Sequence, residues 1–208
     1  PAPEEGTALT HEQARSFLAA AENATYSPLW LLYLSTGLRR GEGLGLTWSD
    51  VDWKRNTLSI RQQVTVVKVP KGKTAPVLAE VKSRASRRTL EMDAHLALAL
   101  AEHQEASHQA RERQKFYRES DLVFCTRNGL ILNPLNVLRT FHQIASSSGM
   151  PADLCIHDLR HTHATHMVLA GVPILEVSRR LGHSKASITY DKYSHLTPGY
   201  VGSATAAV

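Results

Sequence analysis

Apolar residues near the start of the chain recur at the spacing of a helix. Thr10 and Gln13 have the separation of a capping box. Phe17, Leu18 and Ala21 follow on one side of the predicted helix. We therefore predict a first helix that begins at Thr10.

A second helix is predicted from the run 29–34, which is apolar on every side and so typical of a buried helix. Ser27-Pro28 suits its start, because proline is tolerated at the first helical position. Gly37 suits its end, and residues 38–46 favour a further short turn or helix.

Alternation of apolar and polar residues then predicts strands. One half-buried strand is expected over 58–66, a second over 77–81 and a third, shorter one over 89–92. Residues 70–73 contain Pro and Gly and predict the turn between the first two strands.

Helical composition dominates the rest of the chain. A long helix is expected from Asp93 to about Tyr117, and Asn128-Gly129 marks a tight turn. Further helices are expected from Asn133-Pro134, over 158–170, over 173–181, and from a Ser184 cap towards Tyr193.

These elements predict a mainly α fold with one small three-stranded antiparallel β-sheet, an α+β arrangement with about seven or eight helices. We interpret residues 1–9 as a linker remnant, 10–195 as one domain and 196–208 as a C-terminal tail. The chain begins PAPEEG without Met, so we interpret it as a fragment or a processed chain.

Composition excludes several classes of protein. The 208 residues are 42% hydrophobic, enough for a packed core, yet no apolar run approaches the roughly 20 residues that cross a bilayer. Cys125 and Cys155 are too few for a disulfide framework and favour a reducing compartment. The N-terminus lacks a signal-peptide pattern.

The charge balance permits nucleic-acid binding without proving it. Lys and Arg number 24 against 19 Asp and Glu, a formal net charge of +5. Basic residues crowd into the predicted hairpin region, where a solvated surface is the plainer interpretation: Lys68, Lys71, Lys73, Lys82, Arg84, Arg87 and Arg88.

Two regions carry residues suited to chemistry on a phosphodiester. Arg39 lies at the turn after the buried helix with Glu42 three residues on, a spacing that also fits a surface ion pair. His157 and Arg160 project to the same side of a helix. Two guanidiniums can grip phosphate oxygens and stabilise a pentacoordinate transition state. A tyrosine hydroxyl such as that of Tyr193 can attack phosphorus, and a lysine or histidine can protonate the leaving oxygen.

These motifs together resemble the tyrosine recombinases, or phage-type integrases. Residues 36–42 are similar to the family's TG-x-R-x-x-E box, and 46–52 to the Leu-x-Trp-x-Asp stretch after it. Residues 82–88 resemble the lysine hairpin K-[TS]-x-x-S-x-R. The second half carries H-x-L-R-H at 157–161, followed by L-G-H and by the closing tyrosine with x-His.

The resemblance implies a tyrosine recombinase catalytic-domain fold and a role for each matching residue. Arg39 and Arg160 would clamp the scissile phosphate, and Lys82 would protonate the leaving 5′ oxygen. His157 would accept or relay the nucleophile's proton and contact the phosphate. His183 would donate a hydrogen bond to a non-bridging oxygen, and Tyr193 would attack to give a 3′-phosphotyrosyl bond. Glu42 would orient Arg39, and His161 would support the site. DNA contacts are expected from Lys71, Lys73, Arg84 and Arg87.

Several alternatives remain open beside this interpretation. Tyr190 lies three residues from Tyr193 and competes as nucleophile, with packing as its plainer role. The spacing of His157 and His161 also fits a metal site, but no HExxH pattern appears, Arg160 would repel a cation, and His163 and His166 suit packing. We expect no metal and no cofactor. A type IB topoisomerase-like enzyme and an inactive DNA-binding module are the alternative functions.

The resemblance also implies partners and a cellular place. Relatives carry a separate helical DNA-binding domain ahead of the catalytic one, and we expect this chain to lack it. The expected partner is double-stranded DNA at recombination sites, with a homotetramer on DNA at full length, a monomer as this isolated domain, and no membrane. Binding by the domain alone should depend steeply on salt. We expect it in the cytoplasm of a bacterial or phage-infected cell, associated with the nucleoid.

Overall fold

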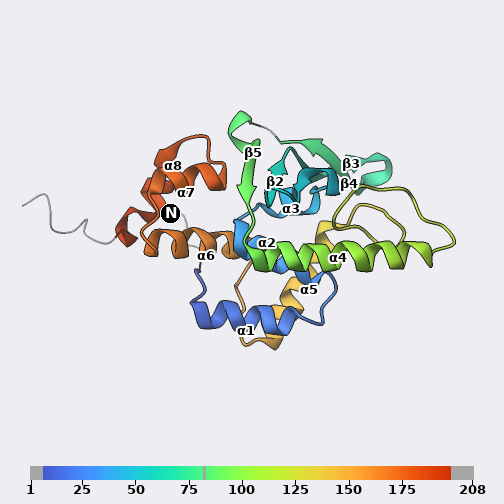
Figure 1. Ribbon diagram of the computed structural model, residues 1–208, viewed down its shortest axis with the longest axis horizontal. Helices are drawn as coiled ribbons and strands as arrows, with labels where there is room; N and C mark the ends of the chain where they lie inside the picture. The colour runs from blue at the N-terminus through green and yellow to red at the C-terminus, as the bar shows by residue number, and fades with distance from the viewer. Residues whose placement is uncertain (1–6, 82, 198–208) are drawn as a thin grey trace, which may run out of the picture.

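The computed structural model describes residues 7–81 and 83–197 and shows a largely helical domain beside two small sheets (Figure 1). The mainly α fold class with a small antiparallel sheet is confirmed. The helices of the described ranges are α1 (His11–Ala21), α2 (Ser27–Thr36), α3 (Arg40–Leu44), α4 (Ala94–Glu112), α5 (Pro134–Ser147), α6 (Ile156–Leu169), α7 (Ile174–Leu181) and α8 (Ala186–Tyr193). Within these ranges, every helix is too short or too polar to cross a bilayer.

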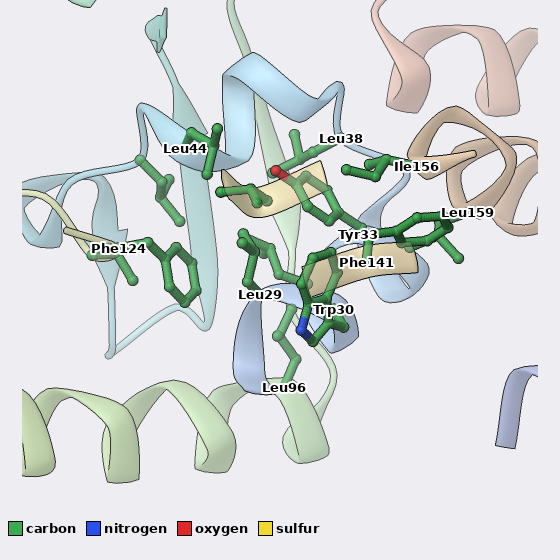
Figure 2. Close-up of a cluster of buried hydrophobic side chains, with 14 of the residues drawn as sticks. Leu29, Trp30, Tyr33, Leu38, Leu44, Leu96, Phe124, Phe141, Ile156 and Leu159 are labelled. Carbon is green, nitrogen blue, oxygen red and sulfur yellow. The ribbon is translucent and has the colours of Figure 1, made fainter. Parts of the chain in front are cut away.

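Helix α2 forms the centre of the fold, as its apolar run predicts. Leu29, Trp30, Leu32 and Tyr33 are fully buried, and α1, α4 and α6 pack around the helix. Figure 2 shows Trp30 and Tyr33 among side chains from α5, α6 and the start of α4. Gly37 ends α2 in the left-handed conformation at φ 65°, which turns the chain towards α3.

Within the described part of the chain, five strands form two separate sheets. Strands β1 (Val51–Asp52), β2 (Thr57–Ile60) and β5 (Arg88–Glu91) form an antiparallel sheet in the order β1-β2-β5. Strands β3 (Gln62–Val69) and β4 (Lys73–Glu80) form a two-stranded ribbon on the upper right of Figure 1.

The single strand predicted over 58–66 is therefore wrong, because the chain changes sheets at Arg61. Leu58 pairs with Leu90 on β5, whereas Val64 pairs with Leu78 on β4. The apolar alternation continues through the break, so the sequence pattern does not show it. The choice of partner depends on strands that lie far along the chain.

The start of the domain is held against α6. Thr10 caps α1 with the predicted capping box, in which its side chain accepts from the Gln13 amide. Leu9 is buried, and its backbone bonds to Thr162 and His166. The predicted linker is thus corrected at its last residue, which packs with the domain. Residues 1–6 of that linker and 198–208 of the predicted tail lie outside the described residues.

Loss of the α1 cap should destabilise the domain. We expect Thr10→Ala to lower the free energy of unfolding by about 1 kcal/mol, because the Gln13 amide loses its acceptor. Urea denaturation measures this change. Thr140→Ala, at a partly exposed position on α5, is the matched control and should change stability by less than about 0.5 kcal/mol. Equal effects from the two substitutions would contradict the role of the cap.

Helices α6, α7 and α8 enclose a second, smaller core. Ala164, Val168, Val177, Leu181 and Tyr193 form it. Figure 1 shows these three helices together at the left of the molecule. The predicted cap at Ser184 is wrong, since α8 begins at Ala186 with no side-chain cap bond. The second core brings the last helix against the H-x-L-R-H segment.

Candidate active site

Arg39 and Glu42 form the first part of the site, at the junction of α2 and α3. The Arg39 Nη1 lies 2.8 Å from Glu42 Oε1, and the Arg39 backbone N–H donates to Glu42 Oε2 at 2.9 Å. The Glu42 side chain is 1% exposed and that of Arg39 is 38% exposed. The alternative of a surface ion pair is wrong, because the carboxylate is buried and only the guanidinium reaches the surface.

Arg88 makes a second ion pair with the same carboxylate. Its Nη2 donates to Glu42 Oε2 at 2.9 Å, and its Nη1 donates to Oε1 at 3.2 Å. Burial would raise the pKa of Glu42, but hydrogen bonds and charges from Arg88 and Arg39 outweigh it and lower that pKa below its ordinary value. Glu42 is therefore ionised and shared by two guanidiniums.

Arg160 enters the site from the first half of α6. It is 3% exposed, with Nη1 donating to the Gly37 carbonyl at 2.7 Å and Nη2 to the Leu181 carbonyl at 2.8 Å. Burial, followed by the charge of Arg39, lowers the pKa of Arg160. A buried guanidinium near a second one creates a demand for an anionic ligand.

His183 follows α7 and is held by α8. Its Nδ1 lies 2.8 Å from the hydroxyl of Thr189, which is fully buried. Burial, followed by the charges of Arg160 and Arg39, lowers the pKa of His183 to about 4, so the ring is neutral at pH 7. The Nδ1–Thr189 contact holds the ring beside the arginines.

Gly182 allows this turn because it has φ 69° and no side chain. A Cβ at this position would lie 2.9 Å from Arg88 Nη1. Its carbonyl accepts from Arg39 Nη2 at 3.3 Å. The turn before His183 is thus hydrogen-bonded to Arg39 and lies directly against the guanidinium of Arg88, and a side chain at Gly182 would collide with it.

Tyr193 lies at the end of α8 with its hydroxyl 2.8 Å from His161 Nδ1. It is 3% exposed, and burial raises its pKa to about 12. His157 is exposed on the first turn of α6, within electrostatic reach of Arg160. The structure thus brings His161, rather than His157, into hydrogen-bond contact with the phenol, while Tyr190 is 41% exposed.

The structure describes only some of the predicted residues of the hairpin region. Lys82, predicted as the proton donor to the leaving oxygen, lies outside the described residues. Of the predicted DNA-contacting residues, Lys71 and Arg84 have side chains that are not described. Lys73 is exposed at the start of β4. Arg87 is exposed and pairs with Glu80 at 2.6 Å.

The remaining histidines of α6 have partners within the fold. His163 Nδ1 lies 2.9 Å from the Leu34 carbonyl, and its Nε2 accepts from Arg180 at 3.1 Å. His166 bonds to the Leu9 carbonyl. Among the residues that the structure describes, no three His, Cys, Asp or Glu side chains are gathered as a metal site.

Acid should destabilise the fold through His163. Burial, followed by the charge of Arg180, lowers its pKa to about 4 from an ordinary value of 6.5. Between these values the unfolded chain binds a proton that the folded chain does not, so stability falls as the pH falls through this window. We expect a loss of about 3 kcal/mol from this residue between pH 7 and pH 4.

Urea denaturation at several pH values measures that loss. His163→Gln should remove this share of the pH dependence, whereas His108→Gln, at an exposed position on α4, should retain it. An unchanged slope of stability against pH in His163→Gln would contradict the assignment.

The site as a whole carries excess positive charge. Arg39, Arg88 and Arg160 face a single carboxylate, Glu42, which leaves two positive charges unbalanced. A pocket of about 300 Å³ opens beside Arg39, lined also by Glu42, Gln63, Val81 and Ser86. Such an arrangement can bind a phosphate group and stabilise charge that develops on it.

Sequence reasoning missed two residues that build this site. Arg88 is one of the basic residues of the predicted hairpin and lies outside the predicted site residues, although the last Arg of K-[TS]-x-x-S-x-R falls on it. Thr189, the partner of His183, has no local signal, because a buried Thr on a short helix is ordinary.

Comparison with known proteins decides the family. The family model described as the phage integrase family matches residues 7–199. This chain belongs to the phage integrase family. The resemblance inferred from the sequence motifs is thereby confirmed.

Relatives of this integrase-family chain are longer than it is. The tyrosine recombinase XerC-like protein of Caldanaerobacter subterraneus subsp. tengcongensis is 31% identical, with 91% of this chain and 50% of that protein covered. The integrase of Streptomyces ambofaciens is 33% identical, with 89% and 48% covered. The chain thus spans about half the length of these curated relatives.

Solved structures confirm the fold of this family member. The Tn1549 transposon integrase, in complex with transposon right end DNA, has a TM-score of 0.76 at 20% identity, covering 92% of this chain and 62% of that one. The catalytic domain of bacteriophage HP1 integrase has a TM-score of 0.59 at 20% identity, covering 97% and 94%. The predicted tyrosine recombinase catalytic-domain fold is confirmed.

Proposed function

We propose that this chain is the catalytic domain of a site-specific DNA recombinase that breaks and rejoins strands through a 3′-phosphotyrosyl intermediate. The observation that carries the proposal is the gathering of Arg39, Arg88 and Arg160 around the single carboxylate of Glu42, with Tyr193 within electrostatic reach of Arg160. Relatives named as tyrosine recombinases and integrases support the same chemistry.

In the proposed step, the Tyr193 oxygen attacks the scissile phosphorus. A bond forms between that oxygen and phosphorus, and the bond from phosphorus to the 5′ oxygen of the next nucleotide breaks. Arg39 and Arg160 hold the non-bridging oxygens, and His183 donates a further hydrogen bond. Lys82 gives a proton to the leaving 5′ oxygen, a role that rests on the hairpin motif. A 5′ hydroxyl of the partner strand later reverses the step.

The phenol proton needs an acceptor, and we assign it to His161. Its Nδ1 is 2.8 Å from the Tyr193 oxygen, whereas His157 is exposed on the first turn of α6. The phenol has a pKa of about 12, so it reacts only when a base takes its proton during attack. Because Tyr193 is 3% exposed, side chains that cover it must also move before DNA reaches it.

The wider assignments follow from the same proposal. Residues 10–195 would form the catalytic domain, and a longer protein would assemble as a homotetramer on double-stranded recombination sites. The domain alone would be monomeric. We propose that it works in the cytoplasm of a bacterial or phage-infected cell, at the nucleoid, because its DNA substrate is there.

Covalent trapping tests the proposal. A pool of random-sequence duplexes with activated, irreversible scissile linkages is incubated with the protein in the presence of a chelator. We expect a protein–DNA adduct on denaturing gels, with peptide mapping that places it on Tyr193. No adduct from this domain or from the full-length protein would overturn the proposal and favour an inactive DNA-binding module.

A further inference from the structure

We propose that Arg88 is a positioning residue that neutralises Glu42 and so leaves the charge of Arg39 available to the scissile phosphate. The inference rests on the proposed function and adds a residue to it. Arg88 lies at the start of β5, 46 residues from Glu42 in sequence, and forms a bidentate ion pair with its carboxylate.

The surroundings of Arg88 keep it away from DNA. Its side chain is 7% exposed. Besides the two bonds to Glu42, its Nε donates to the Arg180 carbonyl at 2.6 Å and its Nη1 to the Ser86 carbonyl at 3.0 Å. These four bonds engage all three nitrogens and four of the five N–H donors of the guanidinium, so the side chain is committed to protein acceptors rather than to a phosphate.

The charge balance explains why this buried arginine matters to the reaction. If Glu42 had only Arg39 as its partner, the two charges would cancel and Arg160 alone would face the phosphate. With Arg88 present, two positive charges remain unbalanced in the group. A phosphodiester carries one negative charge and its pentacoordinate transition state carries a second, so the retained charge stabilises the transition state most.

The contacts of Arg88 also join the segments that form the site. It connects Glu42 on α3 with Ser86 before β5 and with the end of α7, directly before His183. Gly182 lies so close that a Cβ there would meet Arg88 Nη1 at 2.9 Å. One side chain thus holds the arginine box, the lysine-hairpin segment and the L-G-H turn in register.

The test uses three variants and two DNA substrates. Arg88→Met removes the positive charge, and Arg88→Lys keeps that charge but cannot form the bidentate ion pair. Arg88→Met/Glu42→Gln removes the arginine charge and the carboxylate charge together. The substrates are nicked duplexes of a sequence trapped by the wild-type protein, with either a phosphodiester or a neutral methylphosphonate at the cleavage position. Arg111→Lys, in an exposed ion pair on α4, is the matched control and should equal wild type.

We expect Arg88→Met to slow cleavage of the phosphodiester by about 100-fold while DNA affinity stays within about twofold. The methylphosphonate is neutral, so its transition state carries less negative charge and needs less stabilisation by arginine. On this substrate the defect in rate should fall to about tenfold or less. Arg88→Lys should recover most of the rate. The double variant should cleave at least about tenfold faster than Arg88→Met, because no carboxylate is left to neutralise Arg39.

Each other outcome has a definite meaning. Equal defects on both substrates, or a double variant as slow as Arg88→Met, would overturn the charge-balancing role. A loss of DNA affinity would indicate a direct contact instead and also overturn it. If Arg88→Met does not fold, the double variant is compared with Glu42→Gln, and removal of Arg88 should then cost less than about threefold. Failure of the wild-type protein to cleave would refute the proposed function itself.

Discussion

We expect Tyr193→Phe to abolish the covalent protein–DNA adduct while the domain stays folded. We expect the loss to be about 10⁴-fold or more, because the phenol oxygen is the atom that forms the bond to phosphorus. The ring remains packed in the core of α6, α7 and α8. Only the 2.8 Å hydrogen bond to His161 is lost, at a cost of about 1 kcal/mol in the free energy of unfolding.

Trapping on activated duplexes measures the adduct, and thermal unfolding measures the fold. Tyr190→Phe is the matched control, since it removes the hydroxyl of a tyrosine three residues away that is 41% exposed. It should form the adduct at the wild-type rate. An adduct that survives Tyr193→Phe but disappears in Tyr190→Phe would reassign the nucleophile and leave the family unchanged.

Arg160→Met should reduce adduct formation by about 10³-fold with little change in stability. The guanidinium is buried beside Arg39, and its charge is destabilised there, as its lowered pKa indicates. Methionine has a similar length and removes this charge, which offsets the loss of hydrogen bonds to the carbonyls of Gly37 and Leu181. We therefore expect the free energy of unfolding to change by less than about 2 kcal/mol.

Single-turnover trapping together with urea denaturation separates these two effects. Arg160→Lys keeps a positive charge but cannot bond to both carbonyls in the same geometry, so its rate should lie between those of wild type and Arg160→Met. If Arg160→Met retained a rate within tenfold of wild type, the residue would hold the α2–α7 junction together rather than stabilise the phosphate.

Local signals in the sequence are sufficient for much of this protein. The capping box at Thr10, the apolar run of α2 and the glycine at 37 each specify structure through neighbours a few residues away. The helical content and the site residues Arg39, Arg160, His183 and Tyr193 were accessible in the same way, because their motifs occur in order along the chain.

Contacts between distant segments decided the rest. The pattern over 58–66 predicts one strand, but pairing with β5 and β4 divides it. Arg87 and Arg88 are equivalent in composition, yet one pairs with Glu80 at the surface and the other is buried on Glu42.

The amino-acid sequence by itself thus determined the family, most of the helices and the residues that we propose to act on a phosphate. The tertiary structure alone decided that Glu42 is shared by two arginines and that His161 contacts Tyr193. The reason is physical: burial and charge neutralisation depend on which segments meet, and Glu42 and Arg88 are 46 residues apart while His161 and Tyr193 are 32 apart. No pattern among neighbouring residues specifies contacts between segments so far apart in the sequence.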